Sequence, residues 1–402
     1  MSILVKLNSD EVWEEFLQYK LERKHLSTKE QDAWTDFVRK KEYREVTQHL
    51  TEADYCFDYP VKMCVNKSGT RKKRTVYSFS EKETMVLKAM AYLLYQYDDQ
   101  ISPCCYSFRR ELSAKDAIKN ILQIAHLEKK YCLKVDISNY FNSIPTEGLI
   151  KVLEEIIVED EPLLQFMKRL LRADRAYEEG ELICEKRGAM AGIPIAPFFA
   201  NIYLLSMDEM FREKGVEYFR YSDDILLFAD REEQLTEYES LLNKCIKEKG
   251  LCLNPDKVKI SEPKETWEFL GFAYQQGKID LSEVTKNKLK AKIKRKANAL
   301  YRWRKRKNID FERTARKMIQ IFNKKFYDDT DENRFTWSRW FFPVLTTDEG
   351  LRELDAYMLQ YIRFLSSGRH YKGNYRVGYE QIKDLGYRSL VHEYYRGKEE
   401  QK

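Results

Sequence analysis

The sequence has no long hydrophobic run, and this absence excludes one class of protein. No stretch approaches the roughly 18 to 20 consecutive apolar residues that a membrane-spanning helix needs. The N-terminus also lacks the charged and then apolar layout of a secretory signal. We therefore expect a cytoplasmic protein with no membrane partner.

Paired cysteines and clustered histidines are also missing. The eight cysteines include no CxxC pair, and none of the five histidines stands at metal-ligand spacing from another. A disulfide framework needs paired cysteines, and a structural zinc site needs Cys or His ligands at short spacing. The pattern therefore favours reduced thiols over either arrangement.

The chain does contain enough apolar sequence for a large core, together with an uneven charge distribution. Hydrophobic residues make up 43% of the 402 residues, which allows two or three domains. The net charge is only +6, yet residues 285–402 carry 29 Lys+Arg against 15 Asp+Glu. A basic C-terminal third indicates a bound polyanion, although a solvated basic face explains such charge runs equally well.

Hydrophobic patterning predicts helices alternating with short strands, which is typical of an α+β core on an antiparallel sheet. Helices are expected at 10–22, 27–49, 80–97, 113–130, 146–172, 197–214, 232–249 and from 285 onward. Strands are expected at 60–65, 74–79, 131–137, 218–221, 225–230, 258–261 and 269–274.

Three carboxylates stand out in this pattern. Asp136 ends an apolar strand, and Asp223 and Asp224 occupy the turn between two apolar strands. Carboxylates in apolar surroundings are costly to ionise unless cations neutralise them. Hard divalent ions such as Mg²⁺ prefer oxygen ligands, and two of them can support a phosphoryl transfer. For the Asp-Asp pair alone, ordinary turn chemistry is the simpler explanation.

Several segments match the motif series of reverse transcriptases, in the same order and at similar spacing. They are Lys72–Val76, Tyr106–Ile118, Lys134–Pro145, Arg187–Leu204, Arg220–Asp224, Gly250–Lys257 and Phe269–Phe272. The chain therefore resembles bacterial reverse transcriptases with a retron-like or group II intron-like palm, and most of all the stand-alone, defence-associated kind. One motif would be weak, but the ordered series is specific.

The resemblance implies a right-hand polymerase fold. It predicts an N-terminal helical extension at 1–59, fingers and palm at 60–275, and a helical, basic thumb with an accessory region at 276–402. The palm would be an antiparallel sheet flanked by helices.

The resemblance also implies the catalytic residues. Asp136, Asp223 and Asp224 would hold two Mg²⁺ ions, or Mn²⁺ in their place, with the backbone of Ile137 beside them. The activity would be that of an RNA-directed DNA polymerase. Its substrates would be dNTPs, an RNA template and a DNA or RNA primer.

Several further residues are expected around the incoming nucleotide. Arg74, helped by Lys72 or Lys67, would bind the β- and γ-phosphates, and Lys257 would neutralise the leaving pyrophosphate. A solvated surface hairpin accounts for the two fingers lysines equally well. Phe141 would lie under the sugar and exclude a 2′-hydroxyl, although an aromatic residue after a strand is more often part of the core.

One nucleotide-positioning motif departs from the family. The glycine at position 192 is preceded by Met190-Ala191, where reverse transcriptases usually have Pro-Gln. Ala191 and Gly192 are still expected beside the nucleotide, but Ala191 has no side chain that can donate a hydrogen bond. Nucleotide selection and template dependence are therefore the properties most open to change.

The primer and template are expected to contact two further regions. The candidate residues are Tyr221, Leu270, Gly271, Lys292, Arg295 and Arg302. Residues 285–307 hold twelve Lys/Arg and no acidic residue, and an apolar stripe at Leu289, Ile293, Ala297 and Leu300 would face the protein. The opposite face can then follow a phosphate backbone.

Three functions remain open from the sequence. The first is an active reverse transcriptase, expected in anti-phage defence with a dedicated non-coding RNA, or else in a retron or mobile intron. The second is a template-independent or protein-primed DNA polymerase on the same palm. The third is an RNA-binding scaffold without catalysis, which the intact carboxylates disfavour. A homo-oligomer and a partner protein both remain open.

Overall fold

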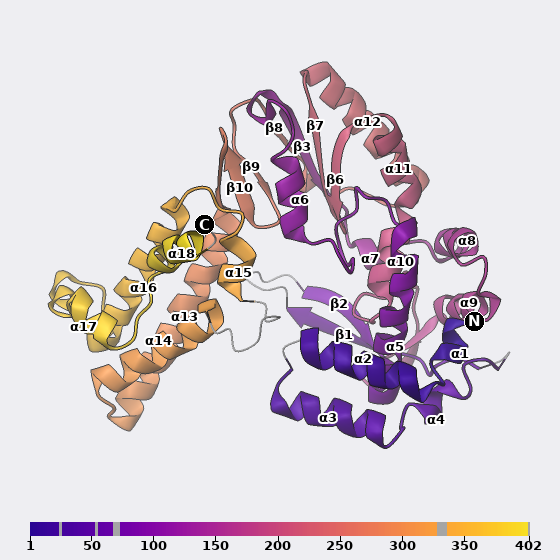
Figure 1. Cartoon of the computed structure of the whole chain (residues 1–402), viewed down its shortest axis with the longest axis horizontal. Helices are drawn as coiled ribbons and strands as arrows, with labels where there is room; N and C mark the ends of the chain where they lie inside the picture. Colours follow the sequence, from indigo (N-terminus) through magenta and orange to yellow (C-terminus); the bar gives the residue numbers. More distant parts are fainter. Residues whose placement is uncertain (24–25, 53–54, 67–72, 328–335, 401–402) are drawn as a thin grey trace. The chain divides into compact units, whose positions relative to one another are not determined.

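The computed structural model describes residues 1–23, 26–52, 55–66, 73–327 and 336–400. The chain divides into two units, Met1–Pro263 and Lys264–Lys402, and Figure 1 shows the elements of each. The first unit contains the expected N-terminal extension and most of the expected fingers and palm. Residues 264–275, which the sequence assigned to the palm region, cluster with the second unit.

The centre of the first unit is an antiparallel sheet, here called the palm sheet, with strand order β6-β7-β3-β8. Its strands are β3 (Tyr131–Asp136), β6 (Glu217–Tyr221), β7 (Asp224–Ala229) and β8 (Lys259–Ser261). Strands β3 and β7 are largely buried because they are nearly continuous apolar runs. Helices and an antiparallel sheet together confirm the predicted α+β class.

A second sheet, the fingers sheet, has strand order β2-β1-β4-β5. Its strands are β1 (Val61–Asn66), β2 (Lys73–Ser78), β4 (Arg175–Glu178) and β5 (Glu181–Cys184). Strands β1 and β2 pair antiparallel, and β4 lies parallel to β1. No strand was predicted at β4 or β5, because both are short, charged and partly exposed and so show no apolar alternation.

Helices surround both sheets of the first unit. Those before β3 are α1 (Ile3–Lys6), α2 (Asp10–Arg23), α3 (Thr28–Arg39), α4 (Arg44–Thr47), α5 (Glu81–Leu93), η1 (Leu94–Gln100), α6 (Ala114–Ile121) and η2 (Leu127–Lys129). Those after it are α7 (Tyr140–Ser143), α8 (Thr146–Ile156), α9 (Glu161–Arg172), α10 (Ala196–Tyr203), α11 (Leu205–Glu213), α12 (Glu232–Glu248) and η3 (Pro255–Lys257).

Several predicted helical ranges are shorter or more divided than expected. The range expected at 27–49 is interrupted at Lys41, where φ is 56°, and the one expected at 113–130 ends before His126, where φ is 55°. The ranges 146–172 and 197–214 each contain two helices, α8 with α9 and α10 with α11. Apolar periodicity alone could not locate these breaks.

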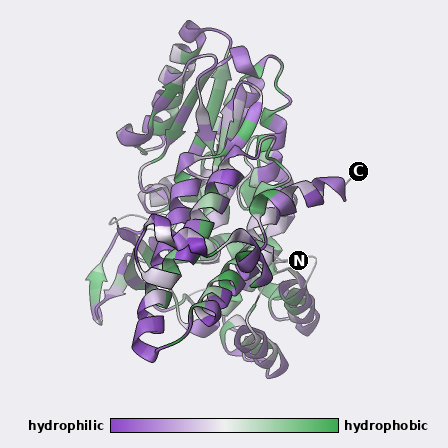
Figure 2. Cartoon of the chain, turned by 90° about the vertical axis from the view of Figure 1, so that its left-hand side faces the viewer, coloured by the Kyte–Doolittle hydropathy of each residue, from purple (hydrophilic) through white to green (hydrophobic). Residues whose placement is uncertain are grey.

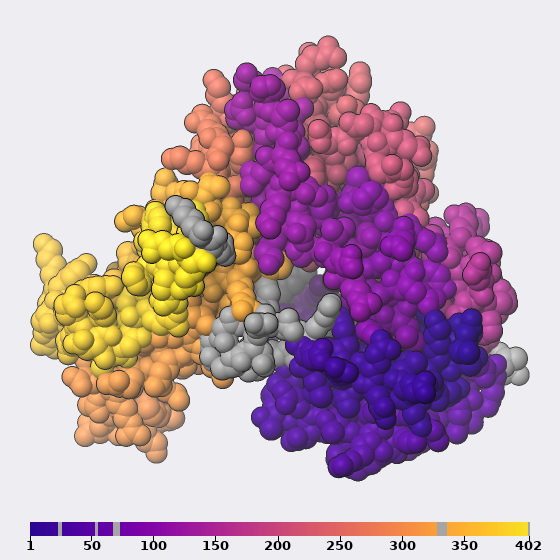
Figure 3. All heavy atoms as spheres, in the orientation of Figure 1, coloured from indigo at the N-terminus to yellow at the C-terminus, as the bar shows by residue number. Residues whose placement is uncertain are grey.

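The N-terminal helices share the core of the first unit rather than forming a separate layer. Trp13, Phe16, Trp34 and Phe37 are buried and belong to the same hydrophobic cluster as the palm residues. The backbone N–H of Ile3 donates to the Asp160 carboxylate at 2.7 Å, which attaches α1 to the start of α9. Figure 3 shows the indigo N-terminal residues packed directly against the purple residues that follow them.

The second unit begins with a three-stranded sheet and continues as helices. Its elements are β9 (Trp267–Phe269), β10 (Phe272–Gln275), β11 (Lys278–Leu281), α13 (Glu283–Lys307), α14 (Phe311–Tyr327), α15 (Trp337–Phe341), α16 (Glu349–Ser367), η4 (Lys372–Arg376), α17 (Tyr379–Asp384) and α18 (Leu390–Glu399). The predicted stripe on α13 is buried, and this helix packs against α14 and α16.

Hydropathy follows this organisation. Figure 2 shows hydrophobic residues concentrated in the strands at the top of the view and hydrophilic residues on the outer faces of helices. Within the residues that the structure describes, none of the helices is both long and apolar enough to cross a bilayer.

Candidate active site

The palm sheet brings the three candidate carboxylates together at one end. Asp136, the last residue of β3, pairs in register with Asp224, the first residue of β7. The backbone N–H of Ile137 donates to the Asp223 carbonyl at 3.1 Å, which joins the end of β3 to the hairpin turn. A register shift of one residue would place one of these carboxylates on the opposite face of the sheet. The strand pairing therefore determines that both lie on the same face.

The turn that holds Asp223 has an unusual backbone. Ser222 has a φ of 62°, in the left-handed region that serine seldom adopts. Its N–H donates to the Ser107 hydroxyl at 2.9 Å, and that hydroxyl donates to Asn201. Buried hydrogen bonds from distant segments therefore hold the turn in this conformation.

The carboxylates of Asp136, Asp223 and Asp224 are buried or partly buried, and they repel one another. Burial, followed by the charges of Asp136 and Asp224, raises the pKa of Asp223. The Lys257 ammonium forms an ion pair with the Asp136 carboxylate. Burial tends to lower the pKa of Lys257, but the hydrogen bond to Asp136 and the nearby carboxylates raise it overall.

The donor set suits hard divalent cations, because it consists of carboxylate oxygens and a cation would relieve their repulsion. Across the described parts of the chain, no three His, Cys, Asp or Glu side chains are already arranged around a point that could hold a metal ion. The Lys257 ammonium lies on one oxygen of the Asp136 carboxylate, Oδ2.

Two predicted nucleotide-binding residues lie together beside this site. The Arg74 guanidinium stands 5.6 Å from the centre of the Phe141 ring, a cation–π contact between β2 and the segment that follows β3. Phe141 is half-buried and packs against the core. Lys67 and Lys72 lie outside the described residues.

Ala191 and Gly192 are attached to the same region through their backbones. The carbonyl of Ala191 accepts from the N–H of Tyr77 at 2.8 Å. The N–H of Ala191 donates to the side-chain oxygen of Asn142, also at 2.8 Å. Gly192 has a φ of 109°, and an added Cβ would stand 2.8 Å from the Tyr77 carbonyl oxygen. The loop therefore lies so close to β2 that only glycine fits at position 192.

A buried ion pair behind the Ser222–Asp224 turn was not predicted. Arg220, next to the turn, donates to both oxygens of Asp208 on α11, and both side chains are 0% exposed. Nη2, one of the two nitrogens on Asp208, also donates to the Asn201 carbonyl, and Nη1 donates to the Ser222 carbonyl. The Tyr218 hydroxyl donates to Asp208 as well. A charged residue inside the apolar run Tyr218–Tyr221 was the available sequence signal, but its partner could not be inferred from spacing.

The candidate primer and template residues fall in both units. Tyr221 is in the first unit, where its ring lies 6.3 Å from that of Phe108. Leu270 and Gly271 form the β9–β10 turn of the second unit with positive φ values of 51° and 92°. Lys292, Arg295 and Arg302 are on the exposed face of α13.

Acidic residues at the end of an antiparallel sheet, next to an aromatic ring and an arginine-bearing strand, define a nucleotide-polymerising palm. Residues 65–274, more than half of the chain, match the reverse transcriptase (RNA-dependent DNA polymerase) family. The chain belongs to this family and is an RNA-directed DNA polymerase. The predicted family is thereby confirmed.

Two of the individual relatives are retron enzymes. The chain is 23% identical over 244 residues to the retron Ec86 reverse transcriptase of Escherichia coli, covering 59% of this chain and 69% of that protein. It is 32% identical over 126 residues to the retron Ec83 reverse transcriptase of the same species, covering 29% of this chain but only 38% of that protein. A structure of telomerase from Candida albicans with a fragment of telomeric RNA aligns at a TM-score of 0.46 with 12% identity, covering 87% of this chain and 68% of that one.

Proposed function

We propose that this chain synthesises cDNA on an RNA template by two-metal nucleotidyl transfer at Asp136, Asp223 and Asp224. The observation that supports this most is the cross-strand pairing of Asp136 with Asp224, directly beside Asp223. Divalent cations, when bound, neutralise charge on the phosphates and acidify the attacking hydroxyl. The predicted pair of Mg²⁺ ions is part of this proposal.

The surrounding residues orient the nucleotide. Arg74 binds the β- and γ-phosphates through its guanidinium fork, and Phe141 supports the sugar. Lys257 balances Asp136 before substrate enters and then turns toward the pyrophosphate that leaves. In this scheme the ion pair with Asp136 keeps the ammonium close to the place where it is needed.

Primer extension tests the proposal directly. Purified protein, Mg²⁺, labelled dNTPs and a primed RNA should give DNA complementary to the template, and EDTA should stop synthesis. Asp223→Ala should abolish incorporation, because the divalent cations would lose one of their carboxylate ligands. Glu217→Gln, at the far end of the same hairpin, serves as the control. Wild-type protein that incorporates no dNTP on any primed RNA would refute the assignment.

A template-independent or protein-primed activity is the second candidate. Its motivating observation is that the Ala191 backbone forms hydrogen bonds with β2 and Asn142. The methyl side chain of Ala191 can offer no hydrogen bond to the nucleotide. Sequencing the DNA product separates the two candidates. Homopolymer or simple-repeat DNA, or DNA attached to protein, supports the second, and a faithful copy supports the first.

The biological setting is a prediction with three competing forms. The resemblance to defence-associated reverse transcriptases motivates a defence role with a dedicated non-coding RNA, whereas the names of the relatives favour a retron system or a mobile intron. Sequencing the RNA that co-purifies with the protein distinguishes them, because it identifies the bound RNA as a retron transcript, an intron transcript or a separate non-coding RNA. Phage plating on cells with and without Asp223→Ala tests the defence role.

A further inference from the structure

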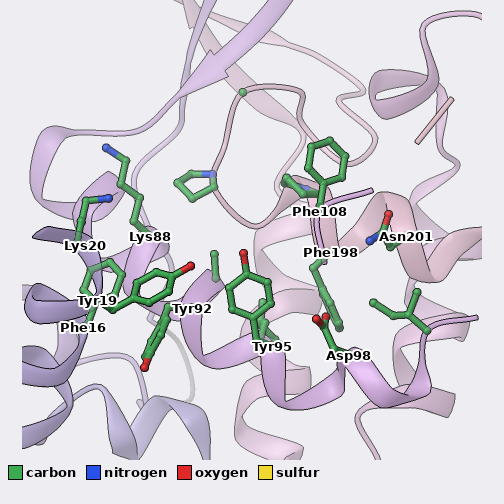
Figure 4. A pocket seen from close by; sticks show the side chains of 16 residues that line it. Phe16, Tyr19, Lys20, Lys88, Tyr92, Tyr95, Asp98, Phe108, Phe198 and Asn201 are labelled. Carbon is green, nitrogen blue, oxygen red and sulfur yellow. The ribbon is translucent and has the colours of Figure 1, made fainter. Parts of the chain in front are cut away.

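A cavity of about 370 Å³ lies in the first unit beside the candidate active site. Its walls come from four parts of the chain: α2, the segment from α5 to Ile101, Phe108, and the loop from Gly192 into α10. Figure 4 shows the side chains that line it. Sites for organic ligands usually span about 300–1,000 Å³, so the cavity can hold one nucleotide-sized group.

Aromatic rings form much of the wall. The rings of Tyr19 and Tyr92 lie 4.7 Å apart, and Tyr95 points toward the middle of the cavity in Figure 4. Burial, and then the neighbouring Tyr19, raises the pKa of Tyr95 to about 12, so its ring stays neutral at physiological pH. Neutral aromatic rings are good stacking surfaces for nucleobases of any sequence.

Positive charge collects on one side of the same cavity. The ammonium groups of Lys20 and Lys88 lie 4.4 Å and 5.5 Å from the Trp34 ring centre, so one indole holds two cations. Figure 4 places both lysines on the same side. The acidic residue in the wall, Asp98, is countered by Arg109 at 3.7 Å. The two ammonium groups give this side of the cavity a positive charge.

The cavity adjoins the proposed nucleotide site. Phe108 lines the cavity, and its ring lies 6.3 Å from both Phe141 and Tyr221. Gly192, which approaches β2, lines the cavity as well. A strand that leaves the nucleotide site on this side meets the aromatic wall next.

We propose that this cavity binds an unpaired nucleotide of the RNA template, with the base against Tyr95 and a phosphate facing Lys20 and Lys88. The inference rests on the proposed function and assigns to the N-terminal helix α2 a part in holding the template. A ring for the base and cations for the backbone are the two elements of single-strand recognition. The cavity would hold the strand before it pairs with an incoming nucleotide.

The test compares two primer–template duplexes that differ only in the single-stranded RNA beyond the primer, one nucleotide or six. Binding is measured by fluorescence anisotropy without dNTPs, so that the result does not depend on catalysis. The wild type should bind the long overhang about tenfold more tightly, since stacking one base contributes roughly a factor of five to a hundred. Tyr95→Leu should lose most of this gain, and Tyr95→Phe should keep it.

Lys88→Gln provides a second variant at an exposed position that does not depend on core packing. It should flatten the slope of log affinity against log salt concentration by about 0.7 for the long overhang, as expected for one lost phosphate contact. Lys244→Gln is the matched control: it changes an exposed lysine of α12 in the same unit, and it should leave the slope unchanged.

Equal affinity of wild type for both overhangs would overturn the inference. So would equal effects of Lys88→Gln and Lys244→Gln, or a Tyr95→Leu variant that retains the full gain. Each of these outcomes leaves primer extension intact. Failure of the proposed function appears instead as no incorporation with either overhang, so the two failures are distinguishable.

Discussion

Asp208→Asn tests whether a buried ion pair holds the catalytic turn in place. Asp208 and Arg220 are both 0% exposed, and the Arg220 Nε donates to the carboxylate at 2.7 Å. Although burial opposes it, the charge of Asp208 holds the pKa of Arg220 well above its usual value. The asparagine keeps the side-chain shape but leaves the guanidinium buried without a counter-ion.

The expected loss is large. Removing one partner of a buried ion pair costs about 3–5 kcal/mol, and a typical domain has only about 5–15 kcal/mol of stability in all. Urea unfolding followed by tryptophan fluorescence should therefore show a markedly lower midpoint for Asp208→Asn. Single-turnover dNTP incorporation should also slow under conditions where the variant is still folded, because Arg220 donates to the Ser222 carbonyl at 3.3 Å.

A double variant separates stability from positioning. In Asp208→Leu with Arg220→Met both charges are gone, and apolar replacement of a whole buried pair is often neutral or stabilising. Stability should recover only in part, because the Tyr218 hydroxyl and the Asn201 carbonyl lose a buried partner. Incorporation should stay slow, because the contact to Ser222 is lost. Glu209→Gln is the control: its ion pair with Arg212 is partly exposed, so its removal should cost less than about 1 kcal/mol.

Two results would refute this reasoning. An unfolding midpoint of Asp208→Asn equal to that of Glu209→Gln would show that the buried charge is compensated in another way. A double variant with full stability and wild-type incorporation would show that Arg220 does not position the turn.

Three further predictions follow from single positions. Phe141→Ala should raise ribonucleotide incorporation relative to dNTPs by about tenfold or more, measured by competition, because the 2′-hydroxyl no longer meets the ring; unchanged discrimination would place the selectivity elsewhere. Burial, and then the charge of Lys292, lowers the pKa of Lys325 from 10.5 to about 8. The folded chain therefore loses this proton before the unfolded chain does, and stability should rise between pH 8 and 10. In urea unfolding at pH 7, Lys325→Met should have a larger free energy of unfolding than the wild type, and this difference should narrow by pH 9.5. A difference that stays constant with pH would contradict the lowered pKa of Lys325. Gly192→Ala should raise the KM for dNTPs because a Cβ would stand 2.8 Å from a carbonyl of β2, whereas Gly215→Ala, also at positive φ but with nothing within 4 Å, should leave KM unchanged.

Much of the palm could be read from the sequence because its signals are local. An apolar strand that ends in Asp136 and a hairpin that carries Asp223 and Asp224 both have short-range patterns, and the structure forms both elements where they were expected. The buried stripe of α13 was predictable for the same reason, since helical periodicity reports which face is covered. The ordered motifs gave the family, which the match at 65–274 confirms.

The short elements and their breaks were less accessible. Strands β4 and β5 are too polar to reveal themselves, and the turn at Lys41 depends on packing rather than on residue type. The division of the chain also differs from the expected boundary, because contacts group residues 264–275 with the helices that follow them. Contacts between elements set such a boundary, and no local pattern records them.

The sequence by itself determined the residue types, the order of the motifs and the apolar faces, and these established the family. The tertiary structure alone decided which side chains meet. Lys257 pairs with Asp136 across 121 positions, and Arg220 finds Asp208 on a neighbouring helix. The cavity likewise exists only because α2, the α5–η1 segment and the loop at Gly192 pack together. Periodicity reports how each segment is buried, whereas charge pairing and cavity shape depend on how the segments are placed against one another.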